Sequence, residues 1–349
     1  MPDSLDLVPH HPLEKGWHTP VKTDHLFIDT CIQIWPDTDF SKLHTYGVAA
    51  YCITTFRPDG DHGTSFDALA DWIRIGNRYP NIRIATKAAD IVAAKSANQA
   101  AIVIAAQGGD FLGPNLYRLE PFVRLGLRVM IPCYNKRNAL GDGCLEPGNA
   151  GLSTMGRSFV AEANRLGLVI DLTHVGERTT LDILDVTNSP VVFTHSNPKK
   201  LVDSPRNITD EQIRRCAATG GVIGVTNWGP LNLRKGRTTR PTVDEFIDAV
   251  KYIVDMVGID HVGIGTDMSH GTYPDGDLIR GRPGQQGSDY GRAIEASVRS
   301  RLRYCEGFDD YGQINAVADA FARRGFDSAS TAKVLGGNFL RVFERVWGG

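Results

Sequence analysis

Two histidines close two short apolar runs near the middle of this chain of 349 residues. His174 ends the run at 168–174, and His195 ends the run at 191–195. Both runs are rich in β-branched residues, as strands buried on both faces are, and a helical stretch of crossover length separates them. Because the carboxyl ends of parallel strands meet on one face of an α/β fold, two imidazoles there predict a metal site. Taken singly, each histidine could also simply form hydrogen bonds in a loop.

Polar side chains follow other strand-like runs as well. Asp267 follows the run at 261–266, where a carboxylate can complete a zinc shell, act as a general base, or simply cap a loop. Neutral imidazoles suit zinc and other borderline metals, and a site with three protein ligands leaves a position for an activated water. The other candidates at strand ends are Cys31, Gln33, Gln107, Tyr134 and Asn227.

Cys31 admits three interpretations. A cysteine in a buried strand is usually an inert small hydrophobe. Its place at the end of a strand also allows a thiolate metal ligand, or a nucleophile with His174 or His195 as its base. A thiolate beside two imidazoles binds metal ions strongly, so we predict that Cys31 contributes to a metal site, and the other two interpretations stay open.

Eight apolar runs alternate with amphipathic segments, which predicts an α/β fold of the single (β/α)8 TIM-barrel class. A strand-like run at 82–86 and a helix at 88–94 are predicted to be an insertion after the second strand. We expect one domain over residues 1–349, with an irregular arm at 1–24 and a closing helix within 328–349. Long connections at 134–150 and 269–290 are expected to wall the site. The predicted strands are 25–32, 47–56, 101–106, 127–133, 168–174, 191–195, 221–226 and 261–266, and the predicted helices are 66–78, 116–125, 153–166, 179–186, 210–218, 243–257 and 331–346.

The composition fits a soluble protein. Lys and Arg number 38 against 40 Asp and Glu, for a formal charge of -2, and no basic run interleaves with aromatic residues, so nucleic acid is not an expected partner. No apolar run approaches the roughly 20 residues of a membrane span, and the N-terminal segment lacks the apolar core of a secretion signal. The six cysteines form no CxxC pair, which favours reduced thiols. We expect a cytoplasmic homodimer without membrane contact.

Several stretches, taken in order, resemble the membrane (renal) dipeptidase family, the M19 metallopeptidases among the amidohydrolase-like barrels. The resemblance extends over nearly the whole chain and implies the barrel fold, hydrolysis of dipeptides and a pair of zinc ions. The matching stretches are GCLEP at 143–147, GLVIDLTHV at 167–175, VFTHS at 192–196, RNITD at 206–210, GGVIGV at 220–225, VGIGTD at 262–267 and GGNFLRV at 336–342.

The sequence departs from the family pattern at one of the two implied metal positions. Cys31 and Gln33 stand where the family's first strand carries a His-x-Asp pair, and Gln107 replaces the metal-bridging glutamate. Tyr134 aligns with a histidine that contacts the substrate in the family. Replacing two carboxylates by amides removes negative charge that would hold a second cation, so we predict one ion, not two.

The residues of the other metal position are retained. The resemblance implies His174 and His195 as its ligands, Asp267 as the residue that transfers protons, and Arg206 as the group that binds a substrate carboxylate. We therefore predict one divalent ion, expected to be zinc, in this site. The predicted metal residues are His174, His195 and Gln107, the catalytic residues are Asp267 and Cys31, and the substrate-binding residues are Arg206, Tyr134 and Asn227.

The predicted function is hydrolysis of a small amide, lactam or ester that carries a carboxylate, by a water that the metal activates. Arg206 would pair with that carboxylate in bidentate fashion. Two alternatives stay open. One is a metal-free enzyme that uses Cys31 as its nucleophile or carries out a lyase-type reaction. The other is a non-catalytic relative that keeps the barrel for binding, against which four polar residues from separate segments argue.

Overall fold

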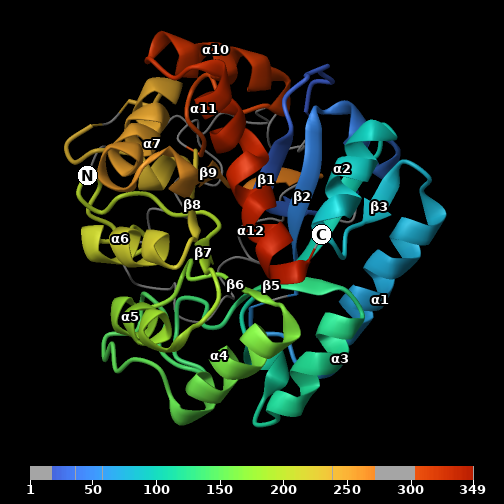
Figure 1. Cartoon of the computed structure of the whole chain (residues 1–349), viewed down its shortest axis with the longest axis vertical. Helices are drawn as coiled ribbons and strands as arrows, with labels where there is room; N and C mark the ends of the chain where they lie inside the picture. Colours follow the sequence, from blue (N-terminus) through green and yellow to red (C-terminus); the bar gives the residue numbers. More distant parts are fainter. Residues whose placement is uncertain (1–17, 36, 57, 238, 272–302, 349) are drawn as a thin grey trace, which may run out of the picture.

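Parallel strands form the centre of the molecule, and helices surround them (Figure 1). The computed structural model describes residues 18–35, 37–56, 58–237, 239–271 and 303–348. Within them, one sheet has the strand order β10-β1-β2-β4-β5-β6, a second has the order β7-β8-β9, and β3 pairs with β4. The strands are β1 (Phe27–Ile34), β2 (Val48–Phe56), β3 (Ile82–Ile84), β4 (Ala100–Gln107), β5 (Leu127–Ile131), β6 (Val169–Ile170), β7 (Val192–Phe193), β8 (Val222–Val225), β9 (Val262–Ile264) and β10 (Met268–His270).

Two joins connect the sheets in the order of the predicted barrel. Asp171 forms a parallel bridge with Val192 between β6 and β7. On the opposite side, the Thr30 hydroxyl of β1 donates to Thr194 O at 2.8 Å and to Ile264 O of β9 at 3.0 Å. The chain therefore has a TIM-barrel-like arrangement, in which a backbone bridge links the β6 and β7 segments and side-chain hydrogen bonds link β1 to β9.

β6 and β7 are much shorter than the sequence predicts. The apolar runs at 168–174 and 191–195 predict strands throughout, but each pairs over only two residues. The carboxylate of Asp171 accepts the backbone N–H groups of Thr173 and Thr194, at 2.9 and 3.0 Å. These strands end early because a side-chain acceptor takes the donors that a neighbouring strand would otherwise bind.

Helices begin where the sequence places capping residues. Thr209 and Gln212 form the reciprocal bonds of a capping box at the start of α6. α1 begins before the predicted residue 66 because Asp61 accepts from the Thr64 N–H group and caps it. The helices are α1 (His62–Arg78), α2 (Ala88–Ser96), α3 (Leu119–Arg124), α4 (Thr154–Leu166), α5 (Glu177–Val186), α6 (Asp210–Ala218), α7 (Val243–Val257), α10 (Ile314–Arg323), α11 (Ser328–Ala332) and α12 (Asn338–Trp347).

The additions to the barrel differ in part from the predicted ones. β3 and α2 form the predicted insertion, and β3 pairs with the start of β4. A π-helical turn, Lys333–Gly337, divides the predicted closing helix into α11 and α12. The predicted loop at 269–290 begins instead with β10, which pairs with β1, and from residue 272 onward it lies outside the described residues. Of the predicted arm at 1–24, only residues from 18 onward are described.

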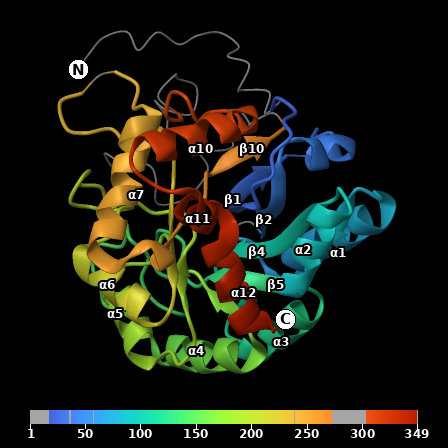
Figure 2. The same ribbon diagram turned by 45° about the horizontal axis from the view of Figure 1, so that its top comes forward.

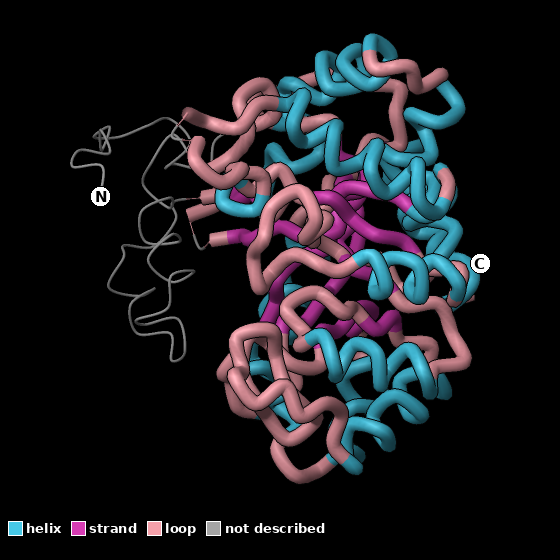
Figure 3. The backbone as a smooth tube through the Cα atoms, turned by 90° about the vertical axis from the view of Figure 1, so that its left-hand side faces the viewer, coloured by secondary structure: helices cyan, strands magenta, loops and turns pink. Residues whose placement is uncertain are grey.

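α12 packs across the amino-terminal ends of the strands. Residues from the beginnings of strands, such as Ile28 and Val222, form one buried cluster with Phe339 and Phe343 of α12. Figure 2 shows α12 between α7 and α2, and Figure 3 shows loops gathered on one side of the strands. The amino-terminal end of the barrel is therefore closed, which leaves the carboxyl ends of the strands for a site. None of the described helices combines the length and apolar character needed to cross a membrane.

Candidate functional site

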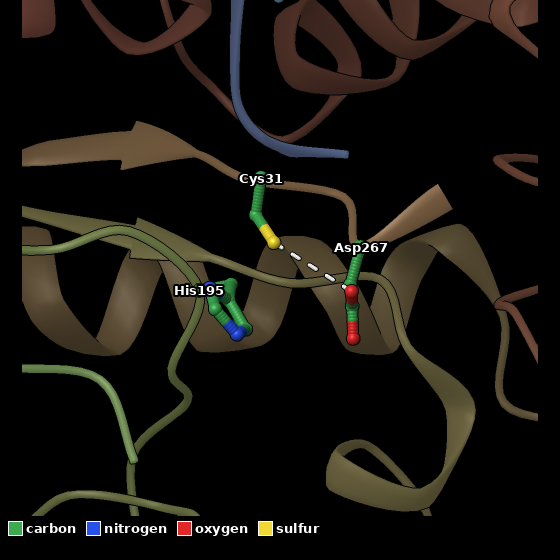
Figure 4. Close-up of side chains that lie close together, drawn as sticks. All are labelled: Cys31, His195 and Asp267. Atoms are coloured by element: carbon green, nitrogen blue, oxygen red, sulfur yellow. Dashed lines mark hydrogen bonds between the residues drawn. The ribbon is translucent and has the colours of Figure 1, made fainter. Parts of the chain in front are cut away.

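Cys31, His195 and Asp267 come together at the carboxyl ends of the strands (Figure 4). Cys31 lies on β1, His195 follows β7 and Asp267 follows β9, and their ligand atoms all lie within 4.8 Å of one another. The Cys31 thiol donates to Asp267 Oδ1 at 3.6 Å. Cys31 and His195 are only 2% and 1% exposed. Among the described residues, no other group of three such side chains has the spacing of metal ligands.

His174 and His195 face each other through their Nε2 atoms, which are 3.1 Å apart. Nδ1 of His174 lies 2.7 Å from Asn135 Oδ1, and Nδ1 of His195 lies 2.8 Å from Thr194 Oγ1. An amide oxygen can only accept, so His174 carries its proton on Nδ1. Because Thr194 donates its own hydroxyl proton to Asp171, His195 also carries its proton on Nδ1.

This proton arrangement leaves a lone pair on both facing Nε2 atoms, and such a pair is suited to share a cation. Two nitrogens bound to one tetrahedral zinc ion at 2.0–2.1 Å are about 3.3 Å apart, close to the separation in this site. Burial, with a smaller effect of the Arg206 charge, lowers the pKa of His195 well below its usual value. The ring is therefore neutral, which is the form that binds metals. The histidine pair fits a divalent ion.

The backbone is left-handed at three residues of the site. The φ angles are 67° at His174, 56° at Asp267 and 62° at Asn135. Non-glycine residues occupy this region rarely, and such strain tends to gather at functional positions. The turns that follow β6, β9 and β5 thus hold the side chains in the places described above.

The side-chain amide nitrogens of two glutamines donate hydrogen bonds to members of the cluster of Cys31, His195 and Asp267. Gln33 Nε2 donates to Asp267 Oδ1 at 3.2 Å, and Gln107 Nε2 donates to Cys31 Sγ at 3.2 Å. The predicted role of Gln107 as a metal ligand requires its oxygen, because an amide nitrogen has no lone pair to give. In this structure Gln107 acts as a hydrogen-bond donor, and its ligand role stays a prediction.

The protein environment keeps the Cys31 thiol protonated. Burial raises the pKa of Cys31 well above its usual value, and the negative charges of Asp267, Asp29 and Asp171 raise it further. Burial also raises the pKa of Asp267, although the hydrogen bond from Gln33 acts in the opposite direction. A thiol in these surroundings needs a nearby cation to become a thiolate.

Two buried aspartates that are not among the predicted site residues position the site. Asp171 accepts from Thr173 and Thr194, as described above, and Asp29 accepts from the N–H groups of Cys31 and Thr266, at 3.2 and 2.8 Å. Burial raises the pKa of Asp29 to about 6 despite these bonds. A signal for both was present in the sequence, since each is a charged residue inside an apolar run, just before a candidate site residue.

The three predicted substrate-binding residues have different surroundings. Arg206 is 3% exposed and donates through Nη2 to His195 O at 3.4 Å. Tyr134 stacks on His174, with ring centroids 3.9 Å apart and planes inclined by 25°. The Asn227 side-chain amide nitrogen donates to Phe308 O, so this nitrogen is already used in a hydrogen bond to the backbone. Arg206 and Tyr134 therefore lie against the histidine pair, whereas Asn227 is anchored to the segment after β10.

A cavity of about 200 Å³ opens beside His174. Its wall is built by the segments that follow β5, β6 and β7, and it includes Cys144, His174 and Arg206. The long connection at 134–150 supplies part of this wall, as predicted. The cavity gives a small molecule a place next to His174.

Comparisons with known proteins agree with this geometry. The model of the membrane dipeptidase family, peptidase family M19, matches residues 12–277. The dipeptidase tcpJ of Claviceps purpurea is 29% identical over 269 residues, which are 76% of this chain and 55% of that protein. The chain thus spans about half the length of this curated relative.

Solved structures share the architecture. An amidohydrolase from Pseudomonas aeruginosa is 29% identical, with a TM-score of 0.82 over 93% of this chain and 98% of that one. A metallopeptidase from Rhodobacter sphaeroides, solved with a phosphinate mimic of the dipeptide L-Ala-D-Ala, has a TM-score of 0.76 at 18% identity, over 93% of this chain and 100% of its own. The second likeness concerns the fold alone.

Proposed function

Because the chain belongs to the membrane dipeptidase family, peptidase family M19, we propose that it is a metal-dependent hydrolase of small, carboxylate-bearing amides. The observation that carries this proposal is the pair of Nε2 atoms, 3.1 Å apart, whose lone pairs converge because Asn135 and Thr194 bind the other nitrogens of His174 and His195. Dipeptides are the first substrates to test, since a relative at 29% identity is named a dipeptidase.

One divalent ion would be held by His174 and His195, with Cys31 and Asp267 as the adjacent donors. Nitrogen, sulfur and oxygen donors of these types suit zinc. A bound ion supplies Lewis acidity, which makes a water molecule a nucleophile near neutral pH. The orientation of both imidazoles depends on their outer hydrogen bonds, as is usual for metal-binding histidines.

We assign proton transfer to Asp267. Its Oδ1 atom accepts from Gln33 and Cys31, so Oδ2 is the oxygen that we assign to take the proton from the attacking water. Burial raises the pKa of this carboxyl group, which improves a carboxylate as a general base. Arg206, buried beside His195, would bind the substrate carboxylate and orient the amide.

Gln33 and Gln107 support one ion over two. Each presents an N–H group, to Asp267 Oδ1 and to Cys31 Sγ respectively, where the family pattern has a carboxylate ligand for a second ion. An amide N–H group carries partial positive charge and thus offsets part of the negative charge of Asp267. A second cation would have to displace both donors without gaining a carboxylate at either position.

The metal-free alternative, with Cys31 as nucleophile, has less support. Only the thiolate attacks a carbonyl effectively, and burial together with three nearby carboxylates keeps the Cys31 thiol protonated. A bound cation would reverse this balance, and the thiolate would then be a metal ligand. Metal binding and a free Cys31 nucleophile are therefore competing uses of one sulfur atom.

Counting metal ions tests the proposal. After dialysis against zinc and removal of free ions, elemental analysis should find close to one ion per chain, and His195→Ala should lose it. The triple change Cys31→His, Gln33→Asp and Gln107→Glu, which restores the family pattern, should bring the count toward two. Gln99→Glu, which adds a negative charge of the same kind at the other end of the barrel, is the control and should leave the count at one.

The outcomes separate the alternatives. Two ions about 3.5–4 Å apart in the unaltered protein would contradict the single-metal proposal. A metal-free protein that cleaves a panel of dipeptides, N-acyl amino acids, lactams and esters would instead favour Cys31 as nucleophile. A metal-loaded protein inactive on the whole panel would favour a binding role. The homodimer and the cytoplasmic location stay predictions from the sequence.

A further inference from the structure

The cavity beside His174 is bordered by two cationic side chains of one loop. Its wall includes Lys199 and Arg206, both from the segment between β7 and α6, and Cys144 from the segment after β5. Its volume of about 200 Å³ lies below the roughly 300–1,000 Å³ of pockets for drug-sized ligands. The cavity therefore suits a group about the size of one amino-acid side chain, next to His174.

Backbone contacts near residues 198 and 208 hold together the two ends of the loop that carries Lys199 and Arg206. Lys199 N–H donates to Ile208 O at 2.8 Å, and Pro198 forms a parallel bridge with Ile208. Thr209, the N-cap residue of α6, directly follows Ile208 and starts the capping box of that helix. The backbone thus brings Lys199 close to the segment that carries Arg206, although six positions in the sequence lie between them.

Both cations act on one thiol, that of the half-buried Cys144. Burial raises the pKa of Cys144 to about 11, while the positive charges of Arg206 and Lys199 each lower it. Arg206 is buried, and Lys199 is half-buried, in contrast to the exposed neighbour Lys200. Lys199 and Arg206 also line the same cavity, so both positive charges lie near this thiol.

The acidic residues around the cavity do not cancel this charge in its interior. Glu146 accepts from the backbone N–H of Arg137 at 3.2 Å and lies 3.8 Å from its guanidinium group, so its charge is partly offset outside the cavity. Glu177 is exposed on the first turn of α5 and therefore lies at the rim, where water screens it.

We propose that Lys199 provides a second anion-binding position beside Arg206, and that the preferred substrates carry two anionic groups, the terminal carboxylate and an acidic side chain on the same residue. Arg206 offers a planar fork for one carboxylate, and Lys199 offers a point charge for the other. This inference rests on the proposed hydrolase function, and it narrows the substrate to compounds that release an acidic amino acid.

A matched pair of dipeptides tests the inference. Ala-Glu and Ala-Gln have nearly the same shape but differ in the charge of the second side chain. The ratio of their kcat/KM values should favour Ala-Glu by about fivefold or more at low salt, which a partly exposed ion pair can provide, and the preference should shrink with added salt. Lys199→Met should bring the ratio close to one, and Lys199→Arg should retain it.

Lys200→Met is the matched control, since Lys200 is the exposed neighbour and does not line the cavity. This variant should keep the preference for Ala-Glu. Cleavage of both dipeptides without a preference, or a preference that survives Lys199→Met, would overturn the second anion-binding position while the hydrolase function stands.

A binding measurement does not depend on turnover. Calorimetry should show that L-glutamate binds more tightly than L-glutamine by about fivefold, and that Lys199→Met removes the difference. If neither dipeptide is cleaved but this difference is found, the proposed hydrolysis of dipeptides fails and the anion-binding position is retained. If the two amino acids bind equally well, the inference is wrong regardless of activity.

Discussion

Asn135 and Thr194 decide which nitrogen of each site histidine would present its lone pair to a metal. Asn135 Oδ1 accepts from Nδ1 of His174, and the Thr194 hydroxyl group, which donates to Asp171, accepts from Nδ1 of His195. At the scale of single residues, the site therefore depends on where two protons reside. An acceptor of this kind fixes both the ring orientation and the tautomer.

Removing the Asn135 acceptor should weaken metal binding. Asn135→Gly tolerates the positive φ of 62° at this position but leaves Nδ1 of His174 without its amide oxygen. We expect zinc affinity to fall about 10–100-fold, as for other outer hydrogen-bond partners, in a competition with a chelating dye. Asn135→Asp, which keeps an acceptor oxygen, is the control and should retain most of the affinity. Equal losses in both variants would argue for a purely structural effect.

Cys31→Ser distinguishes the two enzymatic roles of the thiol. If Cys31 is a metal ligand, zinc affinity should drop by more than the roughly 10–100-fold loss expected for an outer-shell partner, and some turnover should persist at saturating zinc. Alkylation of Cys31 should also be slower with zinc bound. Cys216→Ala, whose thiol bonds Val191 O away from the site, should leave zinc affinity unchanged. Complete loss of turnover with a covalent adduct on Cys31 would support the nucleophile instead.

Asp310 connects the N-terminal segment to the 3₁₀ helix η7 (Tyr311–Gln313). Its carboxylate accepts from the N–H and hydroxyl groups of Thr19, at 2.8 and 2.6 Å, and lies 3.7 Å from Nδ1 of His18. Burial raises the pKa of Asp310, but the nearby His18 imidazole and the hydrogen bonds from Thr19 and Gly312 outweigh this and lower it below the usual range. This carboxylate therefore joins two elements, the N-terminal segment and η7, by contacts that depend on pH.

The sign of the pH dependence follows from the lowered pKa. A carboxyl group with a depressed folded pKa stabilises the fold above its unfolded pKa of about 3.9, and this stabilisation is lost as the pH falls through the folded value. We expect Asp310→Asn to lower the unfolding free energy by about 1–2 kcal/mol at pH 7, after allowance for partial exposure, and the difference to shrink below pH 4. Urea titrations at several pH values measure it. Asp319→Asn, at an exposed position of α10, should change stability by less than about 0.5 kcal/mol.

α12 stabilises the barrel at the end opposite the candidate site. The ring of Phe339 is fully buried, and it packs so closely on Gly263 of β9 that a Cβ atom there would lie 2.4 Å from the ring. Phe339→Ala should lower the unfolding free energy by about 3–5 kcal/mol, because it leaves a cavity under the strands. The partly buried Leu340 of α12 is a milder comparison. Zinc affinity of the folded Phe339 variant should stay within about twofold, and a larger change would contradict the separation of the two ends.

The whole molecule links metal binding to stability, because the ligands come from separate parts of the barrel. His174 and His195 follow β6 and β7, while Cys31 and Asp267 belong to β1 and the turn after β9. An ion that binds only the folded protein should raise the unfolding free energy by about 2.7 kcal/mol at a concentration of 100 times its Kd. Calorimetry should show a higher Tm with zinc than with a chelator, and His195→Ala should lose most of the shift. An unchanged Tm would argue against a preformed site.

The positions of the main site residues were accessible from the sequence. The apolar runs before His174, His195 and Asp267 predicted strands, and parallel strands bring their carboxyl ends to one face whatever the details of packing. The order of the strands and the cap of α6 also followed from local patterns. The lengths of β6 and β7 did not, because the Asp171 side chain takes backbone donors that hydrophobic periodicity assigns to a ladder.

Only the tertiary structure decided how the site residues use their hydrogen bonds. Gln107 and Cys31 are separated by 76 positions, and Thr30 and Ile264 by 234, so their contacts exist only once the ring is closed. The sequence shows an amide at position 107 but not whether its oxygen or its nitrogen faces the thiol. Proton positions, amide orientations and pKa shifts depend on the complete surroundings of a group, whereas strand and helix formation depend mostly on near neighbours.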